Sequence, residues 1–241
     1  MLSWTRKQRR LGLVTVNILQ GSMCRAEREN MSKELELLKE AVKILEEKEN
    51  QQGVGNCPNP EGNKVELSTL NPGEVFKIGD HDFIVLEHED GQTNVISKGF
   101  MAEGVVFDED TRNYTESSIK KLIENDIQPI IERELGPGAL VEHVVDLTSV
   151  DMQKEFEPCT CKVRLITVDE ARKYNDLIAD KSLPDWWWTC TPWSTEERGW
   201  KYGIAVVCPS GNFNFSSCCN YIGVRPFCIL KSNIFVSRGE N

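Results

Sequence analysis

The chain has 241 residues, enough to bury one full hydrophobic core, or one domain with a small appendage, without help from metals or disulfides. Its 28 Lys and Arg against 38 Asp and Glu give a formal net charge of -10, which repels nucleic acid and acidic membrane surfaces. No apolar run approaches the roughly 20 residues of a membrane-spanning helix. We therefore expect neither nucleic-acid binding nor membrane insertion.

Residues 1–30 differ in character from the rest of the chain. Basic residues before a weak apolar stretch imitate a secretory signal, but no clear small-x-small cleavage site follows. Met31 opens a new segment, with Ser32 as a helix cap. We expect residues 1–30 to be an upstream or disordered segment, and the natural start codon stays open among Met1, Met23 and Met31.

A heptad pattern follows over residues 31–50. Its apolar residues are spaced by 4, 3, 4 and 3 positions, and they are Met31, Leu35, Leu38, Val42 and Leu45. This spacing is typical of a coiled coil, and it predicts a homo-oligomer that forms through residues 31–49. A single amphipathic helix packed on its own domain is the alternative. Residues 51–64, rich in Gly, Pro and Asn, are predicted to be a linker.

Residues 65–241 are predicted to form the main globular domain, which begins with a β-meander. The segment 75–86 reads as two strands joined by a turn at Gly79-Asp80. A third strand over 94–97 follows a turn at Asp90-Gly91.

Two helices are predicted next, with a strand over 142–147 between them. Apolar residues at helical spacing predict the first helix over 117–135, bent at Pro129 and closed by the glycines at 136 and 138. The second lies within 164–179, where Thr167 and Glu170 fit a capping box.

The region from residue 184 onward is rich in tryptophan and short strands. Alternation on a strand places Trp186 and Trp188 on one face and Trp187 on the other, which suits a structural role in the core. Strands are predicted over 203–208, 212–216 and 224–230, and together they make a small antiparallel sheet.

The nine cysteines match no disulfide framework. Cys159-x-Cys161 is a poor zinc half-site, because zinc knuckles usually place two residues between their ligands, and only three histidines are present. We interpret the cysteines as buried or idle thiols, whether free or bridged, and predict no metal site.

Several motifs of this tail carry a resemblance to a known family. They are Trp186-Trp-Trp188, Thr191-Pro192, Ala205-Val-Val207, Ser210-Gly211 and Gly223-Val-Arg-Pro-Phe227. The string resembles a domain of unknown function common in prophages and in surface proteins of gut Firmicutes. The C-terminal half of that domain is similar to the C-type-lectin-like fold of formylglycine-generating enzymes and of the variable proteins of diversity-generating retroelements.

The resemblance implies an α+β fold: a C-type-lectin-like domain with small antiparallel sheets and two helices, preceded by the short coiled-coil helix. Independently of the resemblance, Gly223 would fit the turn that enters the last strand, and Pro226 would suit an edge or a bulge. Arg225 would anchor a loop by donating to carbonyl groups.

Between these structural motifs lie residues that suit contact with a partner. Alternation over 212–216 predicts one exposed set of side chains, and Tyr, Trp, Asn and Ser are the residues that binding surfaces favour. The predicted ligand-binding residues, expected to share one open face, are Trp200, Lys201, Tyr202, Asn212, Phe213, Asn214, Phe215, Ser217, Cys218, Cys219 and Tyr221. Adenine-directed mutation of Asn codons in retroelement-diversified relatives yields Cys, Tyr, Ser and Phe, so Cys218-Cys219 is also open to interpretation as a record of diversification.

These observations predict a non-enzymatic, phage-encoded recognition protein of a virion or extracellular surface, made in the bacterial cytoplasm. Its partner would be a protein or glycan on a cell surface, bound without cofactor or calcium. A structural component of a virion or fibre is one alternative. The other is a copper-dependent thiol oxidase of the formylglycine-generating type, with Cys218, Cys219 or Cys228 as ligand or nucleophile, although all three histidines precede residue 144.

Overall fold

The computed structural model describes residues 64–239. The predicted segments 1–30 and 31–50 lie outside these residues, as does the linker up to residue 63, whereas Lys64 already belongs to the first strand. The described part is a mixed α+β structure of mostly antiparallel strands, as the sequence predicts, with one main helix. None of its helices is long and apolar enough to span a bilayer.

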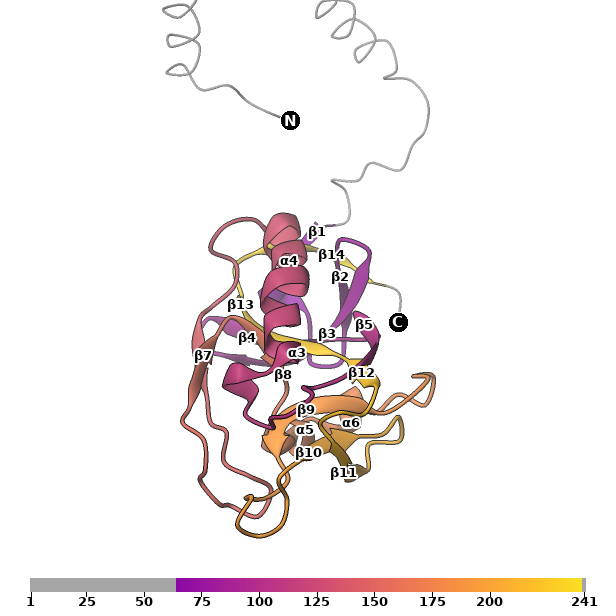
Figure 1. Ribbon diagram of the computed structural model, residues 1–241. Helices are drawn as coiled ribbons and strands as arrows, with labels where there is room; N and C mark the ends of the chain where they lie inside the picture. Colours follow the sequence, from indigo (N-terminus) through magenta and orange to yellow (C-terminus); the bar gives the residue numbers. More distant parts are fainter. Residues whose placement is uncertain (1–63, 240–241) are drawn as a thin grey trace, which may run out of the picture. The chain divides into compact units, whose positions relative to one another are not determined.

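The strands form three sheets (Figure 1). The seven-stranded sheet contains, in spatial order, β1 (Lys64–Glu66), β14 (Phe235–Arg238), β2 (Val75–Ile78), β3 (His81–Glu89), β4 (Gln92–Ser97), β13 (Pro226–Lys231) and β8 (Val163–Leu165). The five-stranded sheet contains β11 (Phe213–Ser217), β10 (Gly203–Val207), β9 (Trp187–Pro192), β12 (Ile222–Val224) and β5 (Ala102–Val105). A small hairpin-like sheet pairs β6 (His143–Val145) with β7 (Cys159–Cys161).

The predicted meander is confirmed as β2, β3 and β4, which are neighbours in the seven-stranded sheet. Gly79 takes the positive φ of +58° that its tight turn requires. At the next turn Asp90 and Gly91 both have positive φ, as a two-residue hairpin loop of this type demands.

The predicted helix over 117–135 is confirmed, with an irregular middle. It runs through α3 (Ser118–Leu122), a π-helical turn η3 (Ile123–Ile127) and α4 (Gln128–Leu135), and a 3-10 turn η2 (Tyr114–Glu116) precedes it. The Ser117 hydroxyl caps its start by accepting from Lys120 N–H. The wide turn comes just before Pro129, which has no N–H to donate and therefore cannot continue a regular ladder.

The second predicted helix is shorter than its pattern, because Arg164 and Leu165 belong to strand β8. It consists of α5 (Val168–Lys173) and α6 (Asn175–Ile178), separated at Tyr174. The predicted capping box is present: Thr167 Oγ1 accepts from Glu170 N–H, and the Glu170 carboxylate accepts from Thr167 N–H at 2.9 Å. A short 3-10 turn, η1 (Leu67–Thr69), follows β1.

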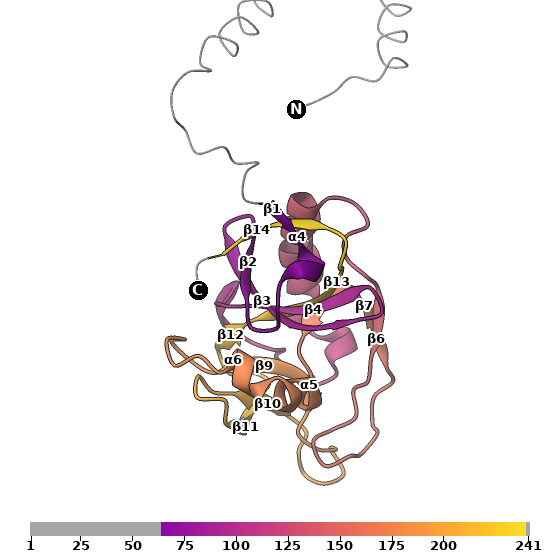
Figure 2. The same cartoon turned by 180° about the vertical axis from the view of Figure 1, so that it is seen from behind.

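The two faces of the seven-stranded sheet carry two apolar clusters. Alternation along β4 sends Val95 into one cluster with α3, η3 and α4, and Ile96 into the other with α5 and α6. The two views show the long helix against one face of this sheet, with α5 and α6 near the five-stranded sheet (Figures 1 and 2). Both faces are therefore covered.

The tail strands do not form one small antiparallel sheet, so that prediction is wrong. β10 and β11 join β9 in the five-stranded sheet, and β12 pairs with β9 in parallel. β13 crosses instead to the seven-stranded sheet, between β4 and β8. Pro226 therefore begins an interior strand and does not lie on a sheet edge.

Candidate functional site

An aromatic cluster covers one face of β10 and β11 where the loop before β10 folds back. The Phe215 ring lies edge-on to Trp200, with centroids 4.6 Å apart, and 5.4 Å from the Trp193 ring. Tyr202 follows in the same loop and is 44% exposed, with the Lys201 ammonium 5.5 Å from its ring. We call Trp193, Trp200, Lys201, Tyr202 and Phe215 the aromatic surface.

Arg112 holds the loop that carries this surface. Its side chain is buried, and its Nε and Nη1 donate to the backbone carbonyls of Lys201 and Ser194 at 3.1 and 2.5 Å. Nη2 is paired with the Glu155 carboxylate, and the guanidinium lies 5.1 Å from the Phe156 ring centroid. One side chain thus fixes both ends of the loop, which reduces the entropy lost on binding a partner.

Asp151 gives the same loop a second attachment. Its carboxylate accepts from the hydroxyls of Ser149 and Ser194, both at 2.6 Å, and from Arg198 at 2.7 Å. These hydrogen bonds favour the charged form and lower the pKa of Asp151 to about 2. The attachment therefore persists at any pH well above that value.

A hollow of about 550 Å³ opens on the opposite face of β11. Its walls are Trp186, which is half-buried, and Tyr221, which is 73% exposed. Its remaining lining residues are Asp185, Val206, Asn214, Phe215, Ser216, Asn220 and Ile222. Aromatic walls, a buried aliphatic base and short polar side chains give the hollow a mixed lining.

The outer edge of β11 is the edge of its sheet, and side chains partly close it. Cys208 N–H donates to Asn212 O, so the groups of Asn212, Asn214 and Ser216 point toward β10 and those of the alternate residues point outward. Of these outward groups, Phe215 N–H donates to Asn214 Oδ1 and Ser217 O accepts from Asn220 N–H. An added peptide strand would have to displace both bonds.

The predicted contact residues do not share one open face. Because side chains alternate on a strand, Asn214 points away from Phe213 and Phe215, and only Asn214 and Tyr221 of the predicted set line the hollow besides Phe215. Phe213 is half-buried and lies near Arg172 of α5, with the guanidinium 5.7 Å from its ring centroid. The set is divided between the two faces of β11.

The prediction that Cys218 binds a ligand is wrong, because its side chain is fully buried. β11 ends at Ser217, but Cys218 N–H still donates to Tyr202 O, so alternation places the Cys218 side chain on the same face as Asn214 and Ser216, where it joins the core cluster of Ile204 and Val206. Its neighbour Cys219 is exposed, with Sγ 3.2 Å from Ser217 Oγ. Asn212 is also exposed, beside the turn at Ser210, and Ser217 is half-buried.

The residues predicted to be structural are mostly in the core. Trp187 and Trp188 are buried in different apolar clusters, and Trp188 Nε1 donates to Val105 O at 2.8 Å. Arg225 donates to the carbonyls of Ser97 and Ile178, which confirms the predicted anchor. Trp186 differs, because it is only half-buried and lines the hollow.

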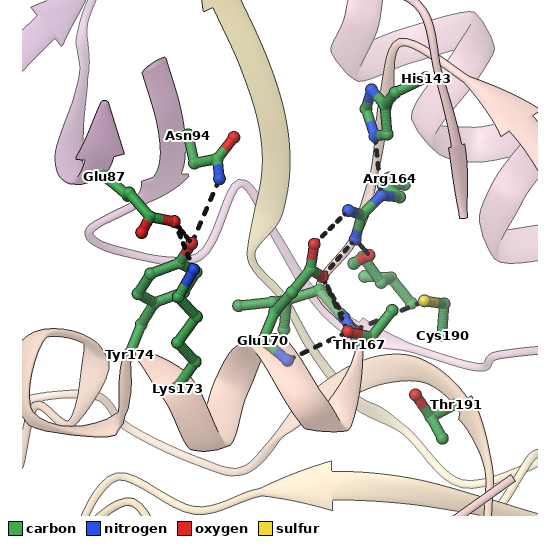
Figure 3. Close-up of polar contacts among 12 residues, drawn as sticks. Glu87, Asn94, His143, Arg164, Thr167, Glu170, Lys173, Tyr174, Cys190 and Thr191 are labelled. Atoms are coloured by element: carbon green, nitrogen blue, oxygen red, sulfur yellow. Dashed lines mark hydrogen bonds and ion pairs between the residues drawn. The ribbon is translucent and has the colours of Figure 1, made fainter. Parts of the chain in front are cut away.

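Sequence reasoning missed the buried polar network around Arg164 (Figure 3). Arg164 Nε donates to His143 Nε2 at 2.8 Å, while Nη1 and Nη2 donate to the two oxygens of Glu170. Nη1 also donates to Leu165 O, and the guanidinium stacks 4.2 Å from the Phe227 ring centroid. The capping box had signalled Glu170, but nothing in the sequence linked it to Arg164 or His143.

This network has the properties of a structural cluster. The ion pair with Arg164 and the bonds from Thr167 outweigh desolvation and lower the pKa of Glu170. Both ring nitrogens of His143 are occupied, by Arg164 and by Val141 O. Nearby, the Tyr174 hydroxyl donates to Glu87, and Lys173 pairs with the same carboxylate (Figure 3).

The thiols of residues 64–239 lie mostly in the core. Cys159, Cys161, Cys190 and Cys228 are buried, and burial raises the pKa of Cys190 and Cys228 to about 12. Within the described residues no group of three His, Cys, Asp or Glu side chains is placed to hold a metal ion.

Comparison with known proteins gives no assignment at this point. Neither family models, nor curated proteins, nor solved structures match the chain.

Proposed function

We propose that this protein is a non-enzymatic recognition protein, and that its C-type-lectin-like domain binds a partner on a cell surface. The observation that carries the proposal is the aromatic surface, which is held on a fixed loop beside the edge strand β11. Tyr and Trp supply rigid, amphipathic contact area at low entropic cost, which is how binding loops achieve affinity.

The rigidity of the loop supports recognition of a partner over the alternative of a structural component of a virion or fibre. Arg112 is buried and reaches two loop carbonyls, and Asp151 adds bonds to Ser194 and Arg198. Such fixation lowers the cost of ordering the loop when a partner arrives. Several copies of the domain, joined through the predicted coiled coil of residues 31–49, would then bind with a higher overall affinity than one copy alone.

The thiol geometry counts against the alternative of a copper-dependent oxidase. Of the three candidate thiols only Cys219 is exposed, whereas Cys218 and Cys228 are buried and burial raises the pKa of Cys218 to about 11, so these residues offer no exposed pair of thiols. A catalytic thiol must be reachable and largely ionised. We therefore keep recognition as the proposed function, on a virion or an extracellular surface.

The test is binding of the labelled full-length protein to intact gut Firmicutes cells, the group in which the resembling domain occurs. Tyr202→Ala is the informative variant, because Tyr202 is 44% exposed and its ring carries the Lys201 ammonium at 5.5 Å. We expect it to weaken binding by about tenfold, a typical loss at a central aromatic contact. Phe235→Ala, an exposed aromatic on β14, is the matched control and should bind as wild type.

Two results would contradict the proposal. One is the absence of saturable binding to any cell of the panel. The other is equal weakening by Tyr202→Ala and Phe235→Ala, which would place the contact outside the aromatic surface.

A further inference from the structure

We infer that the hollow between Trp186 and Tyr221 is a binding site for an uncharged glycan of a cell surface. This inference rests on the proposed recognition function and names its ligand class. The hollow lies on the other face of β11 from the rings of Trp193 and Trp200, and of the aromatic surface only Phe215 also lines it.

The walls and base of the hollow provide apolar contact. Trp186 and Tyr221 stand at its sides, and the buried residues Val206 and Ile222 form part of its lining. The carbon-bound hydrogens of a sugar ring form a flat, weakly apolar face that stacks on an aromatic ring. Its volume of about 550 Å³ lies within the roughly 300–1,000 Å³ range of small-ligand sites.

The rim offers both donors and acceptors to hydroxyl groups. Asn214 Oδ1 accepts from Phe215 N–H, and Asn214 Nδ2 has no partner among residues 64–239 and can donate to a ligand. Asn220 Nδ2 donates to Ser216 Oγ at 2.9 Å, and Asn220 Oδ1 has no partner within the described residues and can accept from a ligand. Ser216 Oγ, which accepts this bond, can still donate its own hydrogen. A sugar diol, in which each hydroxyl both donates and accepts, matches this alternation.

The charge of the lining separates neutral from acidic ligands. No Lys, Arg or His lines the hollow, and Asp185 is its single charged residue. One oxygen of Asp185 accepts from Trp186 N–H at 2.7 Å, so the carboxylate stays at the rim. A phosphate, sulfate or sialic acid would meet no counter-charge and would be repelled by Asp185. The site therefore favours uncharged sugars.

The same lining requires no bridging cation. Asp185 is the only carboxylate among the lining residues, whereas calcium usually takes six to eight oxygen ligands. Binding should thus be equal in EDTA and in calcium.

The experiment presents full-length protein to an array of immobilised neutral, sialylated and sulfated oligosaccharides, with and without EDTA. We expect selective binding to neutral glycans, unchanged by EDTA. Tyr221→Ala should weaken that binding by about tenfold. Asn214→Ala should weaken it less, because it removes one donor.

The controls separate this inference from the recognition function. Phe235→Ala should bind neutral glycans as wild type does, and unchanged thermal unfolding of Tyr221→Ala excludes misfolding as a cause. Binding to cells without binding to any neutral glycan overturns the glycan site and leaves the recognition function standing. Preference for acidic glycans, or neutral-glycan binding that Tyr221→Ala leaves intact, also overturns it. Binding to neither cells nor glycans contradicts both proposals.

Discussion

Nε of Arg164 donates a hydrogen bond to Nε2 of His143 at 2.8 Å. A guanidinium has donors only, so this imidazole nitrogen carries no proton. The proton is on Nδ1, which donates to Val141 O at 3.2 Å. His143 is therefore held neutral, and burial together with the positive charge of Arg164 lowers its pKa below 6.5.

Stability should consequently depend on pH through His143. Above about pH 6.5 the residue is neutral in both the folded and the unfolded chain, and the stabilisation is fully present. As the pH falls below that value the unfolded chain takes up a proton first, so the free energy of unfolding decreases until the folded pKa is passed. His143→Gln keeps an acceptor for Arg164 but does not titrate. Urea unfolding of the wild type and of His143→Gln at about pH 5 to 8 gives the difference between their free energies of unfolding, and this difference should change below about pH 6.5. A difference that stays constant over this range would refute the assignment.

Arg112→Met should lower the free energy of unfolding by about 3 kcal/mol, because it leaves the buried carbonyl of Ser194, the part-buried carbonyl of Lys201 and the Glu155 carboxylate without their partner. The loop of Trp200 should also become sensitive to proteolysis. Urea unfolding and limited proteolysis followed by mass spectrometry measure the two effects. Arg172→Met, at an exposed arginine, is the control. Equal effects of the two substitutions would show that Arg112 does not fix the loop.

Gly223→Ala should cost about 1 to 3 kcal/mol, because a Cβ there would lie 2.4 Å from the Phe100 ring. Gly99→Ala is the matched control, since nothing lies within 4 Å of a Cβ at that position. Replacing Phe100 by Leu in the Gly223→Ala background should recover part of the loss. Thermal unfolding of the wild type, the three single variants Gly223→Ala, Gly99→Ala and Phe100→Leu, and the double variant checks this, and additive losses in the double variant would exclude the contact as the cause.

Native thiol labelling should single out Cys219 within residues 64–239. It is exposed, whereas burial raises the pKa of Cys190 and Cys228 to about 12. Cys208 should follow more slowly, because it is largely buried although the bond with Ser210 helps to lower its pKa. Iodoacetamide pulses with peptide mapping measure the order, and labelling in urea is the reference. Early modification of Cys228 would mean that the core around β13 opens readily.

Local signals in the sequence predicted much of the fold. The turns at Gly79 and Asp90 and the capping box of Thr167 with Glu170 act over a few residues, so short patterns suffice to find them. Alternation likewise placed Trp187 and Trp188 in different clusters. Strands of three residues such as β8 were missed, because their pairing depends on partners far along the chain.

The site was less predictable for the same physical reason. The bonds of Arg112 reach residues 43, 82 and 89 positions away, and no local pattern encodes such contacts. Alternation alone separates Phe215 from Asn214, whereas the groups that cover each face come from β9, β10 and the loop before β10. Cys218 was misplaced because the core residues that bury it, such as Ile204 and Val206, come from another strand, which no local pattern around Cys218 reveals.

The pairing of β1 with β14 has a practical consequence for how the domain is carried. Lys64 lies opposite Ser237, so the first and last described strands run side by side at one end of the seven-stranded sheet. β11 borders the other large sheet, away from that end (Figure 1). A domain whose two ends lie close together can be inserted into a loop of another protein with little strain. The domain should therefore tolerate grafting onto an unrelated scaffold while β11 stays clear of the junction.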